Sequence, residues 1–159
     1  MKILFVRHAI AEEPHSFKGH DDLQRPLTEE GRHKARRVFK LLAKFYDPPE
    51  LIVSSEAVSA RQTADLLAEV FPKAARQEHA GFNPGADYSS LTAWLRGLDR
   101  KLERVALVGH EPDLSMMIGG VVARGHLNIQ VKKAACIEAD CNHLGRGELT
   151  LLLPPWAAA

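Results

Sequence analysis

Short apolar runs alternate with longer amphipathic segments along most of the chain. Residues 3–6, 51–53 and 105–108 are all apolar, which is typical of strands that are covered on both faces of a sheet. A weaker strand is expected within residues 75–79. Polar side chains follow each of the three strong runs within two residues. The ends of these strands are therefore the first places to look for chemistry.

The segment after Leu27 predicts a helix that starts at an N-cap, Thr28, and has acidic residues in its first turn. Apolar residues recur along it at helical spacing until Asp47-Pro48-Pro49 ends it. The same segment carries a run of basic residues that lie mostly off the apolar stripe, a pattern typical of a solvated helix face. These residues are Arg32, Lys34, Arg36, Arg37, Lys40 and Lys44.

Three further helices are predicted by the same spacing. They are expected from about Glu56 to Val70, over the apolar positions between Leu91 and Leu102, and from Pro112-Asp113 through Val122. Two segments with alternating apolar and polar residues, about 130–139 and 148–153, are joined by the glycine-containing stretch 142–147 and predict a hairpin. The polar stretch 14–25 is expected to be a surface loop.

Strands that alternate with helices indicate an α/β fold. We expect a three-layer α/β/α sandwich with a mainly parallel sheet, to which the C-terminal hairpin adds an antiparallel edge. A chain of 159 residues, 45% of them hydrophobic, is about the size of one domain with one sizeable core. A single domain over residues 1–159 is therefore predicted, without repeats or linkers.

The charge balance limits the partners that this chain can have. Lys and Arg number 21 against 20 Asp and Glu, so no polycationic surface is expected for nucleic acid or for anionic lipid. No stretch approaches the roughly 20 apolar residues of a membrane span. The two cysteines, Cys136 and Cys141, are expected to be reduced thiols in a cytoplasmic protein. With His143 they still lack a fourth ligand for a metal.

Three predicted strands deliver polar residues at their carboxyl ends, which is where ligands bind in such sheets. These residues are Arg7-His8, Ser54-Ser55 and Gly109-His110. A strand-end histidine can be a nucleophile, a general base, a metal ligand or a structural hydrogen-bonding group. The guanidinium beside His8 disfavours a metal and suits a phosphate. Since no acidic cluster follows a strand, we expect phosphoryl transfer through a histidine, with neither metal nor cofactor.

Four motifs in order along the chain resemble the signature of the histidine phosphatase superfamily. They are Arg7-His8-Ala9, the block 25–32 (Arg-Pro-Leu-Thr-Glu-Glu-Gly-Arg), Ser54-Ser55 with the block 60–64 (Ala-Arg-Gln-Thr-Ala), and 108–112 (Val-Gly-His-Glu-Pro). The short length and the Arg-Pro-Leu-Thr block are similar to its SixA-like phosphohistidine phosphatase branch. Ala9 is a small departure, because the family usually has glycine there.

The resemblance implies that His8 is the nucleophile and forms a phosphohistidine intermediate. It also implies that Arg7, Arg25 and His110 surround the transferring phosphoryl group. These roles agree with the physical chemistry, because fixed cationic donors stabilise the phosphoryl oxygens without reorganisation. A capping or salt-bridging Arg25 and a structural His110 are the alternatives.

One departure from the family pattern concerns phosphate binding. The family's second motif has an arginine four residues after the serine that ends the strand, and this chain has Ser59 there. Arg61 lies two residues further on, about 200° around a helix, so it fills the same place only if the helix start is shifted. Either Ser59 contributes a hydroxyl and Arg25 carries more of the charge, or catalysis is impaired.

The expected reaction is removal of a phosphoryl group, most simply from phosphohistidine in a protein. An imidazole leaves more readily than an alkoxide, and none of the candidate general acids Glu12, Glu13, Asp87 and Glu111 stands out. A small phosphorylated metabolite is an alternative substrate. Two other functions stay open: a phosphoryl-binding regulatory domain with little turnover, and a metal-dependent hydrolase.

Overall fold

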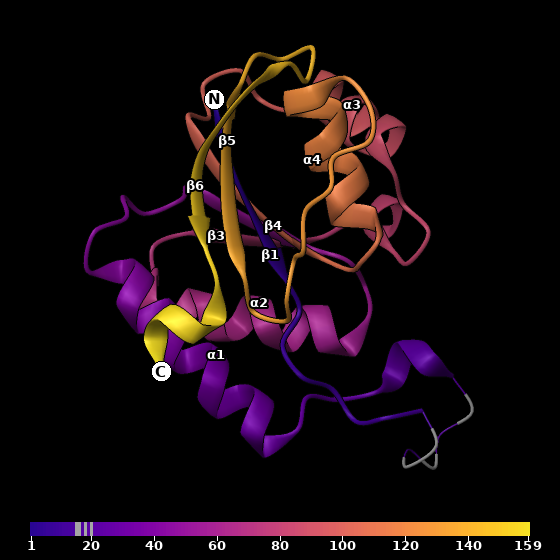
Figure 1. The fold of residues 1–159 in the computed structure, drawn as a ribbon, viewed down its shortest axis with the longest axis vertical. Coiled ribbons are helices and arrows are strands. Elements are labelled where there is room, and N and C mark those ends of the chain that lie inside the picture. Colours follow the sequence, from indigo (N-terminus) through magenta and orange to yellow (C-terminus); the bar gives the residue numbers. More distant parts are fainter. Residues whose placement is uncertain (15–16, 18, 20) are drawn as a thin grey trace.

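The computed structural model describes residues 1–14, 17, 19 and 21–159. Its centre is a six-stranded sheet in the order β3-β2-β4-β1-β5-β6 (Figure 1). Strands β1 to β4 are parallel, and β5 and β6 add an antiparallel edge, as predicted. The strands are β1 (Lys2–Arg7), β2 (Leu51–Ser54), β3 (Ala75–Glu78), β4 (Arg104–Gly109), β5 (Cys136–Cys141) and β6 (Gly147–Leu153).

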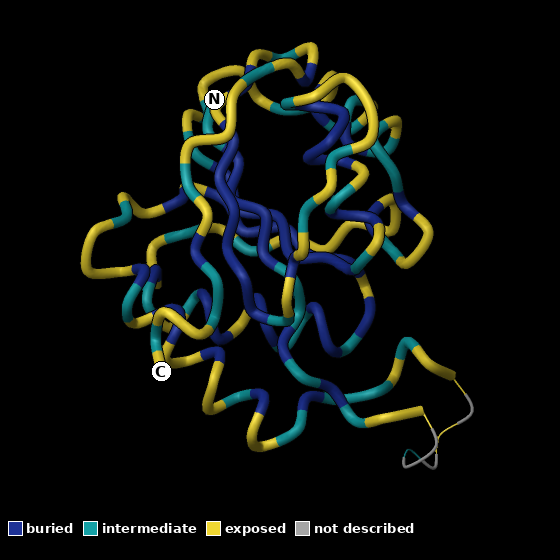
Figure 2. Tube along the Cα trace, viewed as in Figure 1, coloured by how far each residue is buried: buried dark blue, intermediate teal, exposed yellow. Residues whose placement is uncertain are grey.

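Helices cover both faces of the sheet, so the fold is the predicted α/β/α sandwich. Side chains alternate along β1: Leu4 and Val6 pack with α1 and α2, whereas Ile3 and Phe5 pack with α3 and α4. The inner strands β1, β2, β4 and β5 are accordingly buried between the two helical layers (Figure 2), whereas the edge strands β3 and β6 are largely exposed. The helices are α1 (Glu29–Ala43), α2 (Val58–Val70), α3 (Tyr88–Gly97) and α4 (Asp113–Ala123), with short 3-10 helices η1 (Asp22–Gln24), η2 (Ala80–Phe82) and η3 (Pro155–Ala158).

The start of α1 agrees with the sequence. The Thr28 hydroxyl accepts a hydrogen bond from the Gly31 N–H at 2.9 Å, which satisfies one of the free donors of the first turn. Within the predicted loop 14–25, residues 15, 16, 18 and 20 lie outside the described residues. None of the helices in the described part of the chain is long and apolar enough to cross a membrane.

Three boundaries differ from the prediction. Helix α2 begins at Val58 rather than near Glu56, because Ala57 is still extended, and α3 ends at Gly97 because the next residue is extended. Strand β5 begins at Cys136, although alternation starts near residue 130. Ala134 has a left-handed φ of 67°, which interrupts the extended chain and leaves residues 130–135 as a loop.

The strand register brings the three predicted strand ends together. Arg7 of β1 is opposite Gly109 of β4, and Ser54 of β2 is opposite Val108. The backbone continues this pairing, because the His8 N–H donates to the Gly109 carbonyl at 3.0 Å. All three polar strand ends therefore lie at one edge of the sheet.

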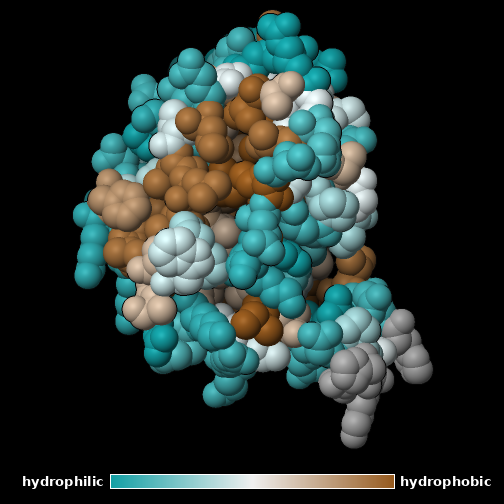
Figure 3. Space-filling model, in the orientation of Figure 1, coloured by the Kyte–Doolittle hydropathy of each residue, from teal (hydrophilic) through white to brown (hydrophobic). Residues whose placement is uncertain are grey.

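The lateral edge of the sheet formed by β6 has a different character. Strand β6 is the last strand in the order, and its Leu149 and Leu152 are 41% and 49% exposed. Hydrophobic side chains gather in the upper middle and left of the face in Figure 3, below a hydrophilic top, and the lower part is mostly hydrophilic.

Candidate functional site

His8 and His110 face each other at the carboxyl ends of β1 and β4. Their ring centroids are 5.1 Å apart. Ser55, directly after β2, contacts one of the two rings, since its Oγ lies 2.7 Å from Nε2 of His110. The structure thus brings together one residue from each of the three strand ends singled out in the sequence.

The tautomer of His8 is fixed by the backbone carbonyl of the next residue. Nδ1 of His8 lies 2.7 Å from the Ala9 carbonyl oxygen. A carbonyl oxygen only accepts hydrogen bonds, so Nδ1 carries the proton and donates it. In the neutral ring, the lone pair is then on Nε2. This is the atom that can act as a nucleophile.

Both histidines are held in the neutral form. Burial lowers the pKa of His8 to about 4, with smaller contributions from the cations Arg7, Lys133 and Arg25, although the hydrogen bond to Ala9 acts in the opposite direction. Burial also lowers the pKa of His110 to about 4, with smaller contributions from His8, Arg7 and Arg25. At neutral pH both rings therefore keep an unprotonated nitrogen.

Arg7 and Arg25 are the two arginines near the histidines, and each donates to a backbone carbonyl. Nη1 of Arg7 donates to the Val131 carbonyl at 2.9 Å, and Nη1 of Arg25 donates to the Glu12 carbonyl at 2.7 Å. Within the described residues, the Nε–H of each arginine is buried without a hydrogen-bond partner. Arg25 Nε is 3.7 Å from an oxygen of Asp22, which is an ion pair rather than a hydrogen bond. Unused guanidinium donors of this kind suit an oxyanion.

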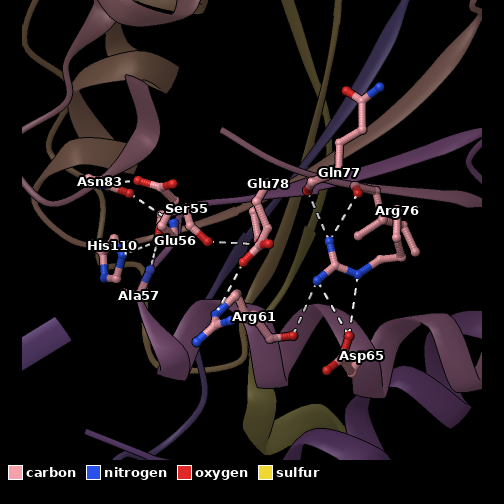
Figure 4. A network of polar contacts seen from close by, with 12 residues as sticks. Ser55, Glu56, Ala57, Arg61, Asp65, Arg76, Gln77, Glu78, Asn83 and His110 are labelled. Atoms are coloured by element: carbon pink, nitrogen blue, oxygen red, sulfur yellow. Dashed lines mark hydrogen bonds and ion pairs between the residues drawn. The ribbon is translucent and has the colours of Figure 1, made fainter. Parts of the chain in front are cut away.

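Ser59 lies beside the nucleophile loop, whereas Arg61 does not. The Ala9 N–H donates to the Thr63 hydroxyl at 2.9 Å, and that hydroxyl donates to the Ser59 carbonyl at 2.7 Å. Arg61 instead pairs with Glu78 of β3 at 3.2 Å (Figure 4). It is also absent from the cations that lower the two histidine pKa values. The helix start is therefore not shifted so as to bring Arg61 into the place of Ser59.

Lys133 is a member of the site that the sequence did not single out. It is half-buried and is one of the cations that lower the pKa of His8. Its loop is fixed to β1, because the Ala134 N–H donates to the Arg7 carbonyl at 3.0 Å and the Arg7 N–H donates to the Ala135 carbonyl at 3.2 Å. The lysine pair 132–133 in an otherwise apolar segment was the available signal. We refer to Arg7, Arg25 and Lys133 together as the cationic cluster.

The carboxylates near the site have other contacts. Glu111 accepts hydrogen bonds from the N–H and the hydroxyl of Ser115, at 2.7 and 2.5 Å. Its charge raises the pKa of Arg7, although burial of the guanidinium lowers that pKa by more. Asp87 is the N-cap of α3 and accepts from the Ser90 N–H at 3.1 Å. Of these two carboxylates, only Glu111 is coupled to the cationic cluster.

Structural comparison finds the same fold in solved phosphatases. The structure of the protein histidine phosphatase SixA complexed with tungstate matches with a TM-score of 0.88 at 19% identity, over 100% of both chains. A candidate SixA from Agrobacterium tumefaciens matches with a TM-score of 0.82 at 23% identity, over 97% of each chain. A candidate α-ribazole-5′-phosphate phosphatase from Escherichia coli matches with a TM-score of 0.75 at 16% identity, over 98% of this chain and 97% of that one. At these identities the matches show the fold alone.

Sequence comparison shows the family. An uncharacterized protein of Picosynechococcus is 31% identical over 140 residues, which cover 86% of this chain and 83% of the relative. The family model of the histidine phosphatase superfamily, branch 1, matches residues 3–83, which include His8, Arg25 and Ser59. The chain therefore belongs to the histidine phosphatase superfamily.

Proposed function

We propose that this protein is a phosphatase that takes a phosphoryl group onto Nε2 of His8 and releases it to water. The observation that carries the proposal is the state of His8. Its Nδ1 donates to the Ala9 carbonyl, and its pKa is lowered to about 4. The imidazole therefore presents a lone pair on Nε2 at neutral pH, next to the cationic cluster.

The proposed reaction has two steps. First, Nε2 of His8 forms a bond to phosphorus while the bond from phosphorus to the substrate's leaving atom breaks. Arg7, Arg25 and Lys133 stabilise the charge on the three equatorial oxygens. Second, water attacks the phosphorus of the intermediate, the bond to Nε2 breaks, and His8 is regenerated with inorganic phosphate.

His110 is proposed to assist the same transfer. The Ser55 hydroxyl already accepts a hydrogen bond from the Ala57 N–H at 3.3 Å, and its own proton can be donated to Nε2 of His110. The remaining proton of the neutral His110 ring is then on Nδ1, where it can be donated to a phosphoryl oxygen. His110 would thus add a neutral donor to the cations.

We propose phosphohistidine in a protein as the substrate. Of the candidate general acids, Glu111 already accepts two hydrogen bonds from Ser115, and Asp87 caps α3. An imidazole, with a solution pKa of about 6.5, needs less help to leave than an alkoxide. The relatedness in fold to SixA proteins supports the same choice. A small phosphorylated metabolite is the alternative that the α-ribazole-5′-phosphate phosphatase match favours.

The proposed reaction needs no metal ion, because the cationic cluster supplies positive charge where the phosphoryl oxygens would lie. We also propose a cytoplasmic location. Cys136 and Cys141 are free, buried thiols, and burial raises the pKa of Cys136 to about 12. Such thiols are usual in a reducing compartment.

The test incubates the protein, in chelator, with a phosphohistidine-bearing protein and separately with an aryl phosphate, and measures released phosphate. We expect turnover of both and faster turnover of phosphohistidine. A quench without acid should trap one acid-labile phosphate on the wild type and none on His8→Ala. Labelling that survives in His8→Ala, or turnover only with added metal, would exclude the mechanism. Binding without turnover would instead identify a regulatory domain.

A further inference from the structure

A groove lies beside the site, between α1, residues 132–134 and η3. Its volume is about 640 Å³, and Arg7 and Lys133 belong to its lining. These are two of the three cations that lower the pKa of His8. When the phosphoryl group of a substrate lies next to His8, the rest of the substrate would therefore lie in or beside this groove.

The charged side chains that line the groove are all of one sign. Lys34 and Arg37 of α1 and Lys132 join Arg7 and Lys133, and no acidic side chain belongs to the lining in the described part of the chain. Lys34 pairs with Glu30 at 2.9 Å, but these side chains are 55% and 65% exposed. Solvent weakens an ion pair of this kind. The groove therefore keeps a net positive charge that is not used by the fold.

The structure divides the basic residues of α1 into two groups. Lys34 and Arg37 line the groove, whereas Lys40 and Lys44 do not. Arg36 pairs with Glu69 of α2 at 3.1 Å. From the sequence alone this run is typical of a solvated helix face, and for the second group that interpretation stands. The first group is part of a concave surface.

The far side of the groove carries an aromatic anchor. Trp156 of η3 is part of the lining and is 71% exposed. Tryptophan and arginine are the residues most enriched at the energetic centres of protein interfaces. A volume of this size also exceeds what a single phosphoryl group needs and falls in the range of about 300 to 1,000 Å³ that is typical of sites for larger ligands.

We propose that this groove binds an acidic segment of the protein that carries the phosphohistidine. The proposal rests on the proposed function and adds a specificity device to it. Carboxylates of the segment would face Lys34, Arg37 and Lys132, while an apolar residue of the segment would pack on Trp156. The groove would thus select among phosphohistidine proteins by the charge of the sequence around the phosphorylated residue.

Two synthetic peptides of equal length test the charge preference. Both contain phosphohistidine, one with glutamates around it and the other with serines at the same positions. We expect wild-type protein to have a KM for the acidic peptide about tenfold lower than for the neutral one at low salt, and the difference to shrink as salt is added. The double variant Lys34→Glu with Arg37→Glu should lose this preference.

The matched control is the double variant Lys40→Glu with Lys44→Glu, which makes the same change in net charge in the last turn and at the C-cap of the same helix, outside the groove. It should keep the preference for the acidic peptide. An equal loss of preference in both double variants would overturn the proposal, because it would show a general field effect. Unchanged KM values in the groove variant would overturn it as well.

Two further measurements separate the groove from the proposed function. Turnover of an aryl phosphate should be the same in wild type and both double variants, since none of these residues belongs to the catalytic site. Binding of the unphosphorylated acidic peptide, labelled and followed by fluorescence anisotropy, should weaken about tenfold in the groove variant and in Trp156→Ala. If no phosphate is turned over but this binding pattern holds, the proposed function fails and the groove stands. If turnover occurs but the peptide binds all variants equally, the groove proposal fails alone.

Discussion

Two polar clusters lie on the same sheet and differ in how their charges are compensated. Toward the amino ends of the parallel strands, Glu138 is only 4% exposed. It accepts hydrogen bonds from Tyr46, from Thr150 at 2.6 Å and from Arg104 at 3.4 Å. At the carboxyl ends, the cationic cluster surrounds two neutral histidines, and Glu111 is the carboxylate whose charge acts on Arg7.

The difference separates a cluster that serves the fold from one that is poised for a ligand. Burial, and then Glu138, raises the pKa of Tyr46, so the tyrosine stays protonated and donates to the carboxylate. Each charged group of that cluster has a partner of opposite charge. Among the described residues, Arg25 of the cationic cluster has only the largely exposed Asp22 at 3.7 Å, and Arg7 has only the nearby charge of Glu111. This weaker compensation costs stability unless an anion is bound. An oxyanion should therefore stabilise the protein, and removal of one of these cations should weaken that effect.

The largest effect is expected from Arg7→Gln. Loss of this cation should lower kcat/KM for an aryl phosphate by about 10² to 10³-fold, the size found when one preorganised donor to a developing charge is removed. Stability without ligand should change little, while the rise in melting temperature caused by vanadate should largely disappear. An Arg7→Gln variant that unfolds more easily but binds vanadate normally would show that Arg7 is structural.

The cluster around Glu138 should respond in the opposite way, with a loss of stability and no loss of anion affinity. Glu138→Ala leaves Tyr46, Thr150 and Arg104 without their shared acceptor, and should lower the free energy of unfolding by about 2 to 4 kcal/mol. Denaturant unfolding measures this change. Vanadate affinity at a temperature where the variant is folded should equal that of the wild type. A loss of affinity without a loss of stability would contradict the division between the two clusters.

A smaller effect is expected from Lys133→Met. Removal of this positive charge should raise the pKa of His8 from about 4 toward its usual value, because protonation is then opposed by one cation fewer. NMR titration of the ring protons, assigned with His8→Ala, measures the pKa directly. Vanadate affinity should fall about tenfold. Lys132→Met is the matched control and should leave the pKa of His8 in place.

The change expected on α2 is a gain rather than a loss. Ser59→Arg should add a charged hydrogen bond to the phosphoryl group, worth about 1.5 to 3 kcal/mol and thus about a tenfold or greater rise in kcat/KM. Arg61→Ala should change phosphate affinity little, because Arg61 pairs with Glu78. Circular dichroism checks that both variants are folded. A severe loss of vanadate affinity in Arg61→Ala would show that Arg61 reaches the site in solution.

The sequence predicted the parts of the site that depend on strand ends and on ordered motifs. His8, His110 and Ser55 follow buried apolar runs, and parallel pairing then makes them neighbours. Lys133 could not be found in this way, because its position depends on a loop. The conformation of that loop depends on hydrogen bonds to the backbone of Arg7 and on the left-handed conformation of Ala134. Neither follows from a hydrophobic pattern.

The groove could not be predicted from the sequence for a similar reason. Lys34 and Arg37 differ from Lys40 and Lys44 only in what packs beside α1, and the partners are η3 and residues 132–134, which are about a hundred residues away in the chain. A helical period identifies the polar face of a helix but does not show which part of that face is covered. The same holds for Asp87, which was a candidate general acid in the sequence. It caps α3 instead, and this depends on the exact residue at which the helix begins.

The hydrogen bond from His8 to the Ala9 carbonyl determines which isomer of the modified residue can form. With Nδ1 occupied by a proton that is donated at 2.7 Å, phosphorylation is confined to the nitrogen remote from the side-chain carbon. The trapped intermediate should therefore be tele-phosphohistidine and not the pros isomer, and ³¹P NMR of the quenched protein distinguishes them. The neighbouring carbonyl would thus set the regiochemistry of the covalent intermediate.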